Sequence, residues 1–379
     1  MQQPDIKKLE EFLSRTPVLI AHMRKSETLL ERRAKRQAWV IVGEPPSEPT
    51  LQHRRLSEEF ACRMNALGND RICIVIDRTR DNFSSAEDIQ KTVVRKYQEI
   101  LGVDDGSRLA LKTALALDWA TKTMPVAMFS QFGEFDGLKK PCLLILPKEP
   151  AIDDVSLKFT HSLRSAPSRF RKNLPISRED IDRIELHHEA FGHGTDAWHK
   201  WHSRADIVVR SNMELRADVA ALIGVIHDTG NVEAAKSWIF ARDLSALRKI
   251  RENKETTFQA IIYANGGELR KALGIIQQIP DIRALKDSGL VRLTDKIFQS
   301  VEVEKAILDA RTNMLDDAFR LVRDAEEGKN TTLPCLPPER LASSVSYLQD
   351  CMQAHAFFMK PAQTPRPKPT CPAPRPVMP

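Results

Sequence analysis

The spacing of apolar and polar residues along the chain predicts a mainly helical protein with a few short strands. Short apolar runs at 71–77 (RICIVID), 125–130 (PVAMFS) and 141–147 (PCLLILP) are typical of buried strands. From residue 177 onward, apolar positions recur with the helical period of about 3.6. Helices are expected over a segment that begins at Ser177 and over 1–36, 55–67, 84–102, 107–122, 212–227, 231–251, 255–263, 268–277, 289–326 and 338–357.

The elements group into four successive parts of a mainly α (α+β) protein. A helical N-terminal arm and a proline-containing linker occupy 1–50, and a small α/β region that holds the expected strands occupies 51–150. A helical domain follows over 151–357. The proline-rich tail, 358–379, is expected to be disordered and is a candidate ligand for partner domains that bind proline-rich segments.

Composition and charge restrict the partners of this protein. The 379 residues are 42% apolar and 28% charged, which is ordinary for a globular protein, and the net charge is +6. Basic residues gather at 24–36, at 164–172 and in the tail, but aromatic residues do not alternate with them. Such clusters are typical of solvated faces and offer no stacking surface for bases, so no nucleic-acid partner is expected.

The sequence indicates a cytoplasmic protein with no membrane segment. The N-terminus has no apolar core of signal-peptide length, and no apolar run is long enough to span a membrane. The six cysteines are scattered without a CxxC pair, which favours reduced thiols over a disulfide framework. A protein exported as an effector without a cleaved signal has the same features, so export stays open.

Half of the ten histidines lie in one stretch, HHEAFGHGTDAWHKWH. A zinc site with an activated water commonly places two histidines at i and i+4 of a helix, with a glutamate after the first. Here His188 is followed by Glu189, but His193 stands at i+5, which on a regular helix is about 140° away. One extra residue in the turn would bring the rings together, and Gly192 lies where it would ease that distortion. If both histidines bind one metal ion, the sequence therefore predicts a π-bulge here.

A carboxylate on the next expected helix completes the set of ligands. The segment SNMELRAD places Glu214 and Asp218 at i and i+4, on one face of that helix. Glu214 is the candidate third metal ligand. Asp218 is the candidate acceptor for the second ring N–H of a ligating histidine, the contact that fixes the tautomer of such a ligand. Arg216 lies between them and is a further candidate for this outer layer.

These two motifs resemble those of a known family of zinc peptidases. HEAFGHGTD is similar to the HExxGH motif of the dipeptidyl-peptidase III metallopeptidases, and MELRAD is similar to their second motif, Glu-x-Arg-Ala-acid, although the gap between the motifs is shorter here. The resemblance implies a zincin-like helical catalytic half, a bound Zn²⁺ and a peptide or protein substrate. The implied zinc ligands are His188, His193 and Glu214, with Glu189 as general base and Asp218 as support.

The implied chemistry is hydrolysis by an activated water. Zinc lowers the pKa of a bound water toward about 7, and a glutamate base takes its proton and hands it to the leaving group. The charge that develops on the substrate oxygen requires a second electrophile. Candidates are Tyr263, beside the Gly-Gly break in IIYANGG, and His227, Arg216, His199 and His202.

Two other functions stay open on the sequence. GVIHDTGN resembles the His-Asp signature of HD-type metal-dependent phosphohydrolases, in which adjacent His and Asp bind a metal on a helix. The ligands would then be His227 and Asp228, completed by His193 and Asp243, and the ELRAD motif would have no role. The third function is that of a non-catalytic interaction protein with a structural zinc, whose proline-rich tail binds its partners.

Overall fold

The computed structural model describes most of the second half of the chain and parts of the first. The described residues are 48–68, 71–77, 126–129, 140–146, 176–196, 206–253, 258–329 and 335–359, with short pieces between 91 and 99. Several expected features lie outside these residues: the helices over 1–36 and 107–122, most of the helix over 84–102, the basic clusters 24–36 and 164–172, and the tail beyond residue 359.

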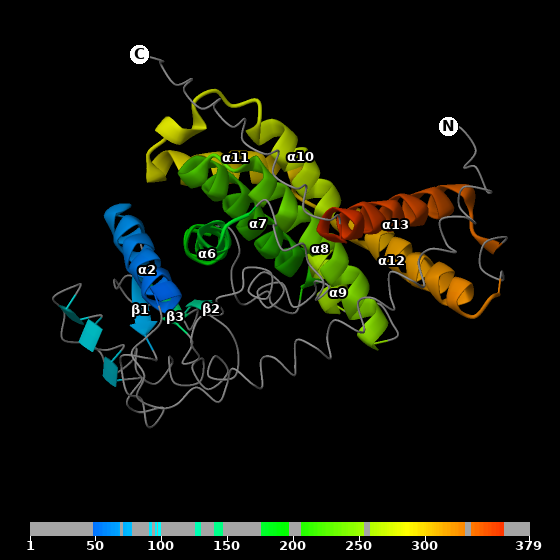
Figure 1. The fold of residues 1–379 in the computed structure, drawn as a ribbon, viewed down its shortest axis with the longest axis horizontal. Coiled ribbons are helices and arrows are strands. Elements are labelled where there is room, and N and C mark those ends of the chain that lie inside the picture. The colour runs from blue at the N-terminus through cyan, green and yellow to red at the C-terminus, as the bar shows by residue number, and fades with distance from the viewer. Residues whose placement is uncertain are drawn as a thin grey trace, which may run out of the picture.

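The described part of the protein is mainly helical, as the hydrophobic pattern predicts (Figure 1). Within it, no helix combines the length and the apolar character that crossing a membrane requires. The helices are α2 (Glu48–Ala66), α6 (Arg178–Leu186), the π-helix η1 (His187–His193), α7 (Ile207–Thr229), α8 (Val232–Asn253), α9 (Phe258–Tyr263), α10 (Gly266–Ile276), the 3-10 helix η3 (Ile282–Ala284), α11 (Asp287–Val301), α12 (Lys305–Glu326) and α13 (Pro338–Met359).

Three strands lie where the sequence predicts them and form one small sheet. They are β1 (Arg71–Asp77), β2 (Val126–Phe129) and β3 (Lys140–Leu146). The order is β1-β3-β2, with β3 parallel to β1 and antiparallel to β2. α2 packs against β1, and both β2 and β3 approach η1. The sheet therefore lies beside the helix that carries the histidines.

α7 is the central helix of the helical half, with η1, α6, α8, α9 and α11 packed around it (Figure 1). It begins at Asp206, whose side chain accepts a hydrogen bond from the N–H of Val208, and ends at Gly230, which has a left-handed φ of 72°. Every residue from 211 to 226 is buried except Glu214, which is half-buried. The polar side chains of this helix therefore lie inside the protein, where each requires a partner.

Helix α6 starts after Ser177, where the sequence predicts the segment to begin. The Ser177 hydroxyl accepts the N–H of Asp180 at 3.0 Å, and the Asp180 carboxylate accepts the N–H of Ser177 at 2.7 Å. Asn231, just before α8, donates to the same carboxylate at 3.0 Å. This capping box fixes both the start of the helix and its position against α8.

A second hydrophobic cluster joins the α/β region to the helical half. Phe60 of α2 packs together with Cys73 of β1 and Phe191 of η1, and the two phenyl rings meet edge to face with 5.8 Å between centroids. This cluster crosses the domain boundary predicted near residue 150. The α/β region therefore shares a core with the histidine-bearing helix.

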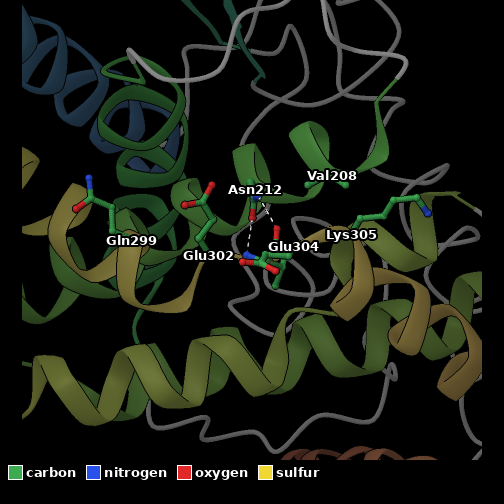
Figure 2. A pocket seen from close by; sticks show the side chains of 7 residues that line it. Val208, Asn212, Gln299, Glu302, Glu304 and Lys305 are labelled. Atoms are coloured by element: carbon green, nitrogen blue, oxygen red, sulfur yellow. Dashed lines mark hydrogen bonds between the residues drawn. The ribbon is translucent and has the colours of Figure 1, made fainter.

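The single helix predicted over 289–326 is wrong, because the chain leaves helical geometry at 302–304, between α11 and α12. The buried Asn212 of α7 accepts the N–H of Val303 at 3.0 Å and donates to its carbonyl at 2.9 Å. Figure 2 shows Asn212 facing this segment. A side chain 91 residues earlier thus pairs backbone groups that a continuous helix would have paired, which a local pattern cannot reveal.

The packing of His187 on α7 predicts the effect of enlarging Gly224. A Cβ added at Gly224 would lie 2.0 Å from Cγ of His187, whose ring is buried and held by Asp228 at 2.9 Å. We expect Gly224→Ala to lower the free energy of unfolding by about 1–3 kcal/mol, measured by urea denaturation. Gly274→Ala is the matched control: its Cβ, in the last turn of α10, would meet nothing within 4 Å, so it should raise stability by up to about 1 kcal/mol. Equal effects of the two substitutions would contradict this packing.

Candidate metal centre

The histidine-bearing helix contains the predicted π-type distortion. η1 is a π-helix over His187–His193, and the N–H of Gly194 donates to the carbonyl of Glu189, five residues earlier, at 3.0 Å. The i, i+5 pair His188 and His193 therefore lies on one face, with ring centroids 4.9 Å apart and ring planes at 90°. The spacing that a regular helix would not allow is accommodated as the sequence requires.

Gly192 is needed in η1 for close packing against α7. A Cβ at this position would lie 2.5 Å from Cα and 2.8 Å from Cβ of Ala217. The reason differs from the one inferred from the sequence, where the glycine was expected to ease the turn. The pair of small residues lets the backbones of η1 and α7 approach closely, so the histidines reach side chains on α7.

Glu214 of α7 completes a group of three side chains that could hold a metal ion. Its carboxylate oxygens lie 3.6 Å from Nε2 of His188 and 3.7 Å from Nε2 of His193. The three ligand atoms all lie within 4.8 Å of one another. Ligands at about 2.0–2.2 Å from a tetrahedral zinc ion are separated by about 3.4 Å, so the donor set and the spacing fit such an ion. Among the described residues this is the one group of this kind.

Asp218 lies next to Nδ1 of His188, on the side of the ring opposite to Glu214, as its i, i+4 spacing from Glu214 predicts. Its Oδ1 is 3.0 Å from Nδ1 of His188. The indole N–H of Trp238 donates to the same oxygen at 2.8 Å, and Arg242 donates to both oxygens from α8. An anion at Nδ1 keeps the proton on that nitrogen and leaves the Nε2 lone pair of His188 for a metal.

Arg242 is a site residue that the sequence did not indicate. Besides its bonds to Asp218, its Nη2 lies 4.0 Å from Oε2 of Glu214, and its guanidinium lies over the rings of Trp238 and Tyr263, 4.7 Å from each centroid. It therefore lies between the carboxylates of Asp218 and Glu214 and the aromatic side chains of the site. No motif surrounds it, and only its i+4 spacing from Trp238 on an expected helix could have suggested a shared face.

The buried charges perturb the titration of the group. Burial lowers the pKa of His188, but the carboxylates of Asp218 and Glu214 outweigh it and raise the pKa to about 10. Burial and the neighbouring charged His188 together lower the pKa of His193 to about 4, against the carboxylate of Glu214, which raises it. Burial raises the pKa of Glu214, but the two imidazoles and Arg242 hold it well below its usual range. Without a metal, one imidazole thus carries the charge that balances Glu214.

Glu189 and Tyr263 both lie close to this group. The negative charge of Glu189 contributes to raising the pKa values of His188 and Tyr263. The largest cause of the raised pKa of Tyr263 is the carboxylate of Glu214, followed by burial of the phenol. The structure therefore brings together the candidate base and the candidate tyrosine, which are far apart in the sequence.

His227 and Arg216 are not placed to contact a substrate at this group. His227 is 13 residues after Glu214 on α7, about 20 Å along the helix, and its ring nitrogens contact Asp228 and the carbonyl of Leu285. Arg216 is fully buried and donates to a backbone carbonyl of η1 and to Asp295. Neither residue is a candidate electrophile for the reaction, contrary to the sequence-based expectation. His199 and His202 lie outside the described residues.

The residues of the alternative His-Asp site do not converge. The Oδ2 atom of Asp228 lies 3.1 Å from Nη1 of Arg63, 2.9 Å from Nη1 of Arg183 and 2.9 Å from Nε2 of His187. The two guanidinium groups already balance its negative charge. Asp243 instead forms an ion pair with Arg270 of α10. The ligands that an HD-type site would need are therefore divided among three separate places.

A surface cavity of about 480 Å³ lies beside α7 but on another side of the helix from Glu214. Its lining includes Asn212, Gln299, Glu302 and Lys305 (Figure 2). Asn212 and Glu214 are two residues apart, so their side chains point about 160° away from each other around the helix. The cavity is therefore not the opening of the metal group.

The contact between Asp218 and His188 predicts a titration that can be measured in the metal-free protein. Because the folded-state pKa of His188 is raised from 6.5 to about 10, its stabilising contribution is complete below pH 6.5 and is lost as the pH rises to about 10. We expect Asp218→Asn to move this pKa toward 6.5 and to reduce the loss of stability over that range. NMR titration of the imidazole signals and urea unfolding at several pH values measure both effects.

His227 provides the internal control for that titration. Its pKa is raised by Asp228, which lies far from Asp218 on the same helix, so the substitution should leave the His227 signal unchanged. An unchanged His188 signal in Asp218→Asn would show that Asp218 does not control this imidazole.

No protein-family model, curated protein or solved structure matches the chain. The resemblance to the dipeptidyl-peptidase III motifs is therefore carried by the motifs of residues 187–218 alone, and the function is argued from the geometry of the group they form.

Proposed function

We propose that this protein is a zinc-dependent hydrolase of the metallopeptidase type. The observation that carries the proposal is the convergence of His188, His193 and Glu214 from two helices, with a π-turn that gives the histidines a common face. A distorted helix and a half-buried glutamate in an otherwise buried helix are costly for a fold that has no use for them. A metal ion accounts for both.

The ligand set favours a catalytic metal over a structural one. Structural zinc sites are closed by four protein ligands, whereas hydrolytic sites commonly have three and leave a position for water. Within the described residues the group has three ligands, two histidines and a glutamate. When bound, the zinc would polarise a water molecule and the carbonyl of the substrate.

The remaining side chains would perform the proton transfers and hold the ligands. Glu189 follows the first histidine ligand and would take the proton from the water and pass it to the leaving group. Asp218 would keep Nδ1 of His188 protonated and its ring oriented. Tyr263, whose pKa is raised by Glu214 and by burial, stays protonated at neutral pH and would donate to the developing oxyanion.

Peptides are the substrate class that the resemblance implies. Amide hydrolysis needs a base that also protonates a leaving amine, and Glu189 would fill both roles. The alternative of an HD-type phosphohydrolase has no support from the positions of His227, Asp228 and Asp243, so peptide cleavage is the activity to test first.

Metal analysis tests the site directly. We expect one zinc per chain in the wild-type protein, and we expect His188→Ala and Glu214→Ala to weaken zinc binding by more than the ~100-fold that loss of an outer-layer partner costs. His227→Ala is the matched control, because His227 lies on the same helix as Glu214 but away from the group. Elemental analysis and competition with a chelator measure the outcome. Loss of zinc in His227→Ala would instead favour the His-Asp site.

Substitution of the base separates a catalytic zinc from a structural one. We expect Glu189→Gln to keep one zinc per chain and to lower peptide turnover by about 10²–10⁴-fold. The assay uses a mixture of synthetic peptides with free and blocked ends, monitored by mass spectrometry, with an activated phosphodiester as the parallel substrate. Unchanged turnover in Glu189→Gln would exclude this residue as the base. Turnover of the phosphodiester alone would overturn the peptidase proposal.

A further inference from the structure

We propose that Arg216 is a positioning residue that closes the last turn of η1 and thereby holds His193, and that Asp295 on α11 fixes Arg216 in that position. This inference rests on the proposed function, because it assigns His193 to a metal. It concerns a different part of the protein, however, since neither Arg216 nor Asp295 belongs to the group of ligands.

The carbonyls at the end of η1 are paired by side chains. The last carbonyl groups of a helix have no partner within the helix. Arg216 donates to the carbonyl of Gly192 through a short hydrogen bond and to the hydroxyl of Thr195 at 3.1 Å. Thr195 in turn donates to the carbonyl of Phe191 at 2.5 Å. One guanidinium from α7 therefore closes this turn directly and through Thr195, and its positive charge is favourable at a helix C-terminus.

The position of His193 depends on this turn. His193 is the last residue of η1 and follows directly the residue whose carbonyl Arg216 binds. His188 lies further inside the helix and contacts Asp218. Opening of the last turn would thus displace one imidazole and leave the other in place, which would widen the spacing that a metal ion requires.

Asp295 is the partner that orients Arg216. Its Oδ1 accepts hydrogen bonds from Nε at 2.9 Å and from Nη2 at 2.7 Å. The Arg216 side chain is fully buried, whereas that of Asp295 is 28% exposed. Without this carboxylate the buried guanidinium would lose its counter-charge and would be drawn toward solvent, away from η1. A residue at the surface of α11 thereby controls one ligand of the site.

The test compares Asp295→Ala with Asp287→Ala. Asp287 lies on the same helix, is 26% exposed and pairs with Arg63 at 2.7 Å. Arg63 contacts η1 through the ring face of Phe191, 5.1 Å from its centroid, rather than through its carbonyls, and it retains Asp228. Three quantities are measured for each variant: affinity for Co²⁺, the visible spectrum of the Co²⁺-loaded protein, and hydrogen exchange of the amides of residues 190–196 in the metal-free protein. Asp295→Asn, which keeps an acceptor without the charge, is the conservative variant.

We expect Asp295→Ala to weaken Co²⁺ binding about tenfold or more, to change the spectrum and to accelerate exchange in 190–196. Asp287→Ala should lower overall stability without these three effects, and Asp295→Asn should restore part of the affinity. Wild-type affinity or exchange in Asp295→Ala would overturn the inference. If the wild type binds neither Co²⁺ nor zinc, the proposed function fails, and hydrogen exchange alone tests whether Arg216 closes the last turn of η1. Faster exchange of residues 190–196 in Asp295→Ala than in Asp287→Ala supports this role. The same exchange rates in the two variants overturn it.

Discussion

The close contact between η1 and α7 is the constraint on which the rest of the structure depends. Gly192 leaves room for the backbone of Ala217, and this approach brings the two imidazoles within reach of the Glu214 carboxylate. Because α7 is buried on nearly all sides, its other polar side chains require hydrogen-bond partners on the surrounding helices. Asp218 accepts hydrogen bonds from α8, and Arg216 donates hydrogen bonds to η1 and α11.

These partners divide the support of the two imidazoles between different elements. His188 is held from behind by Asp218, which Trp238 and Arg242 of α8 fix in turn. The turn that ends at His193 is held by a chain of contacts that begins on α11. Each imidazole is thus held by a different set of helices, so the geometry of the group depends on how these helices pack.

Local patterns predicted the parts of this protein that depend on local physics. The three strands followed from apolar runs, and the start of α6 followed from Ser177 as a helix-starting residue. The i, i+5 spacing of the histidines led to the π-turn, because only that turn reconciles the spacing with one face. Contacts over long sequence separations were not predictable. The break between α11 and α12 depends on Asn212, and the place of Arg242 depends on how α8 packs on α7.

Two charged clusters lie along α7, one at its middle and one at its C-terminal end, and only the first suits a cation. Around the histidine group the carboxylates of Glu189, Glu214, Asp218 and Asp196 outnumber the described cations, the Arg242 guanidinium and the Lys249 ammonium, so neutral imidazoles would leave an excess of negative charge. At the C-terminal end of α7, Asp228 lies between two arginines, Arg63 and Arg183, and its pKa is held far below its usual range. A divalent ion would complete the charge balance at the first cluster, whereas at the second it would have to displace guanidinium groups already in place. The balance of charge, rather than the presence of adjacent His and Asp, therefore decides where this fold can accept a metal.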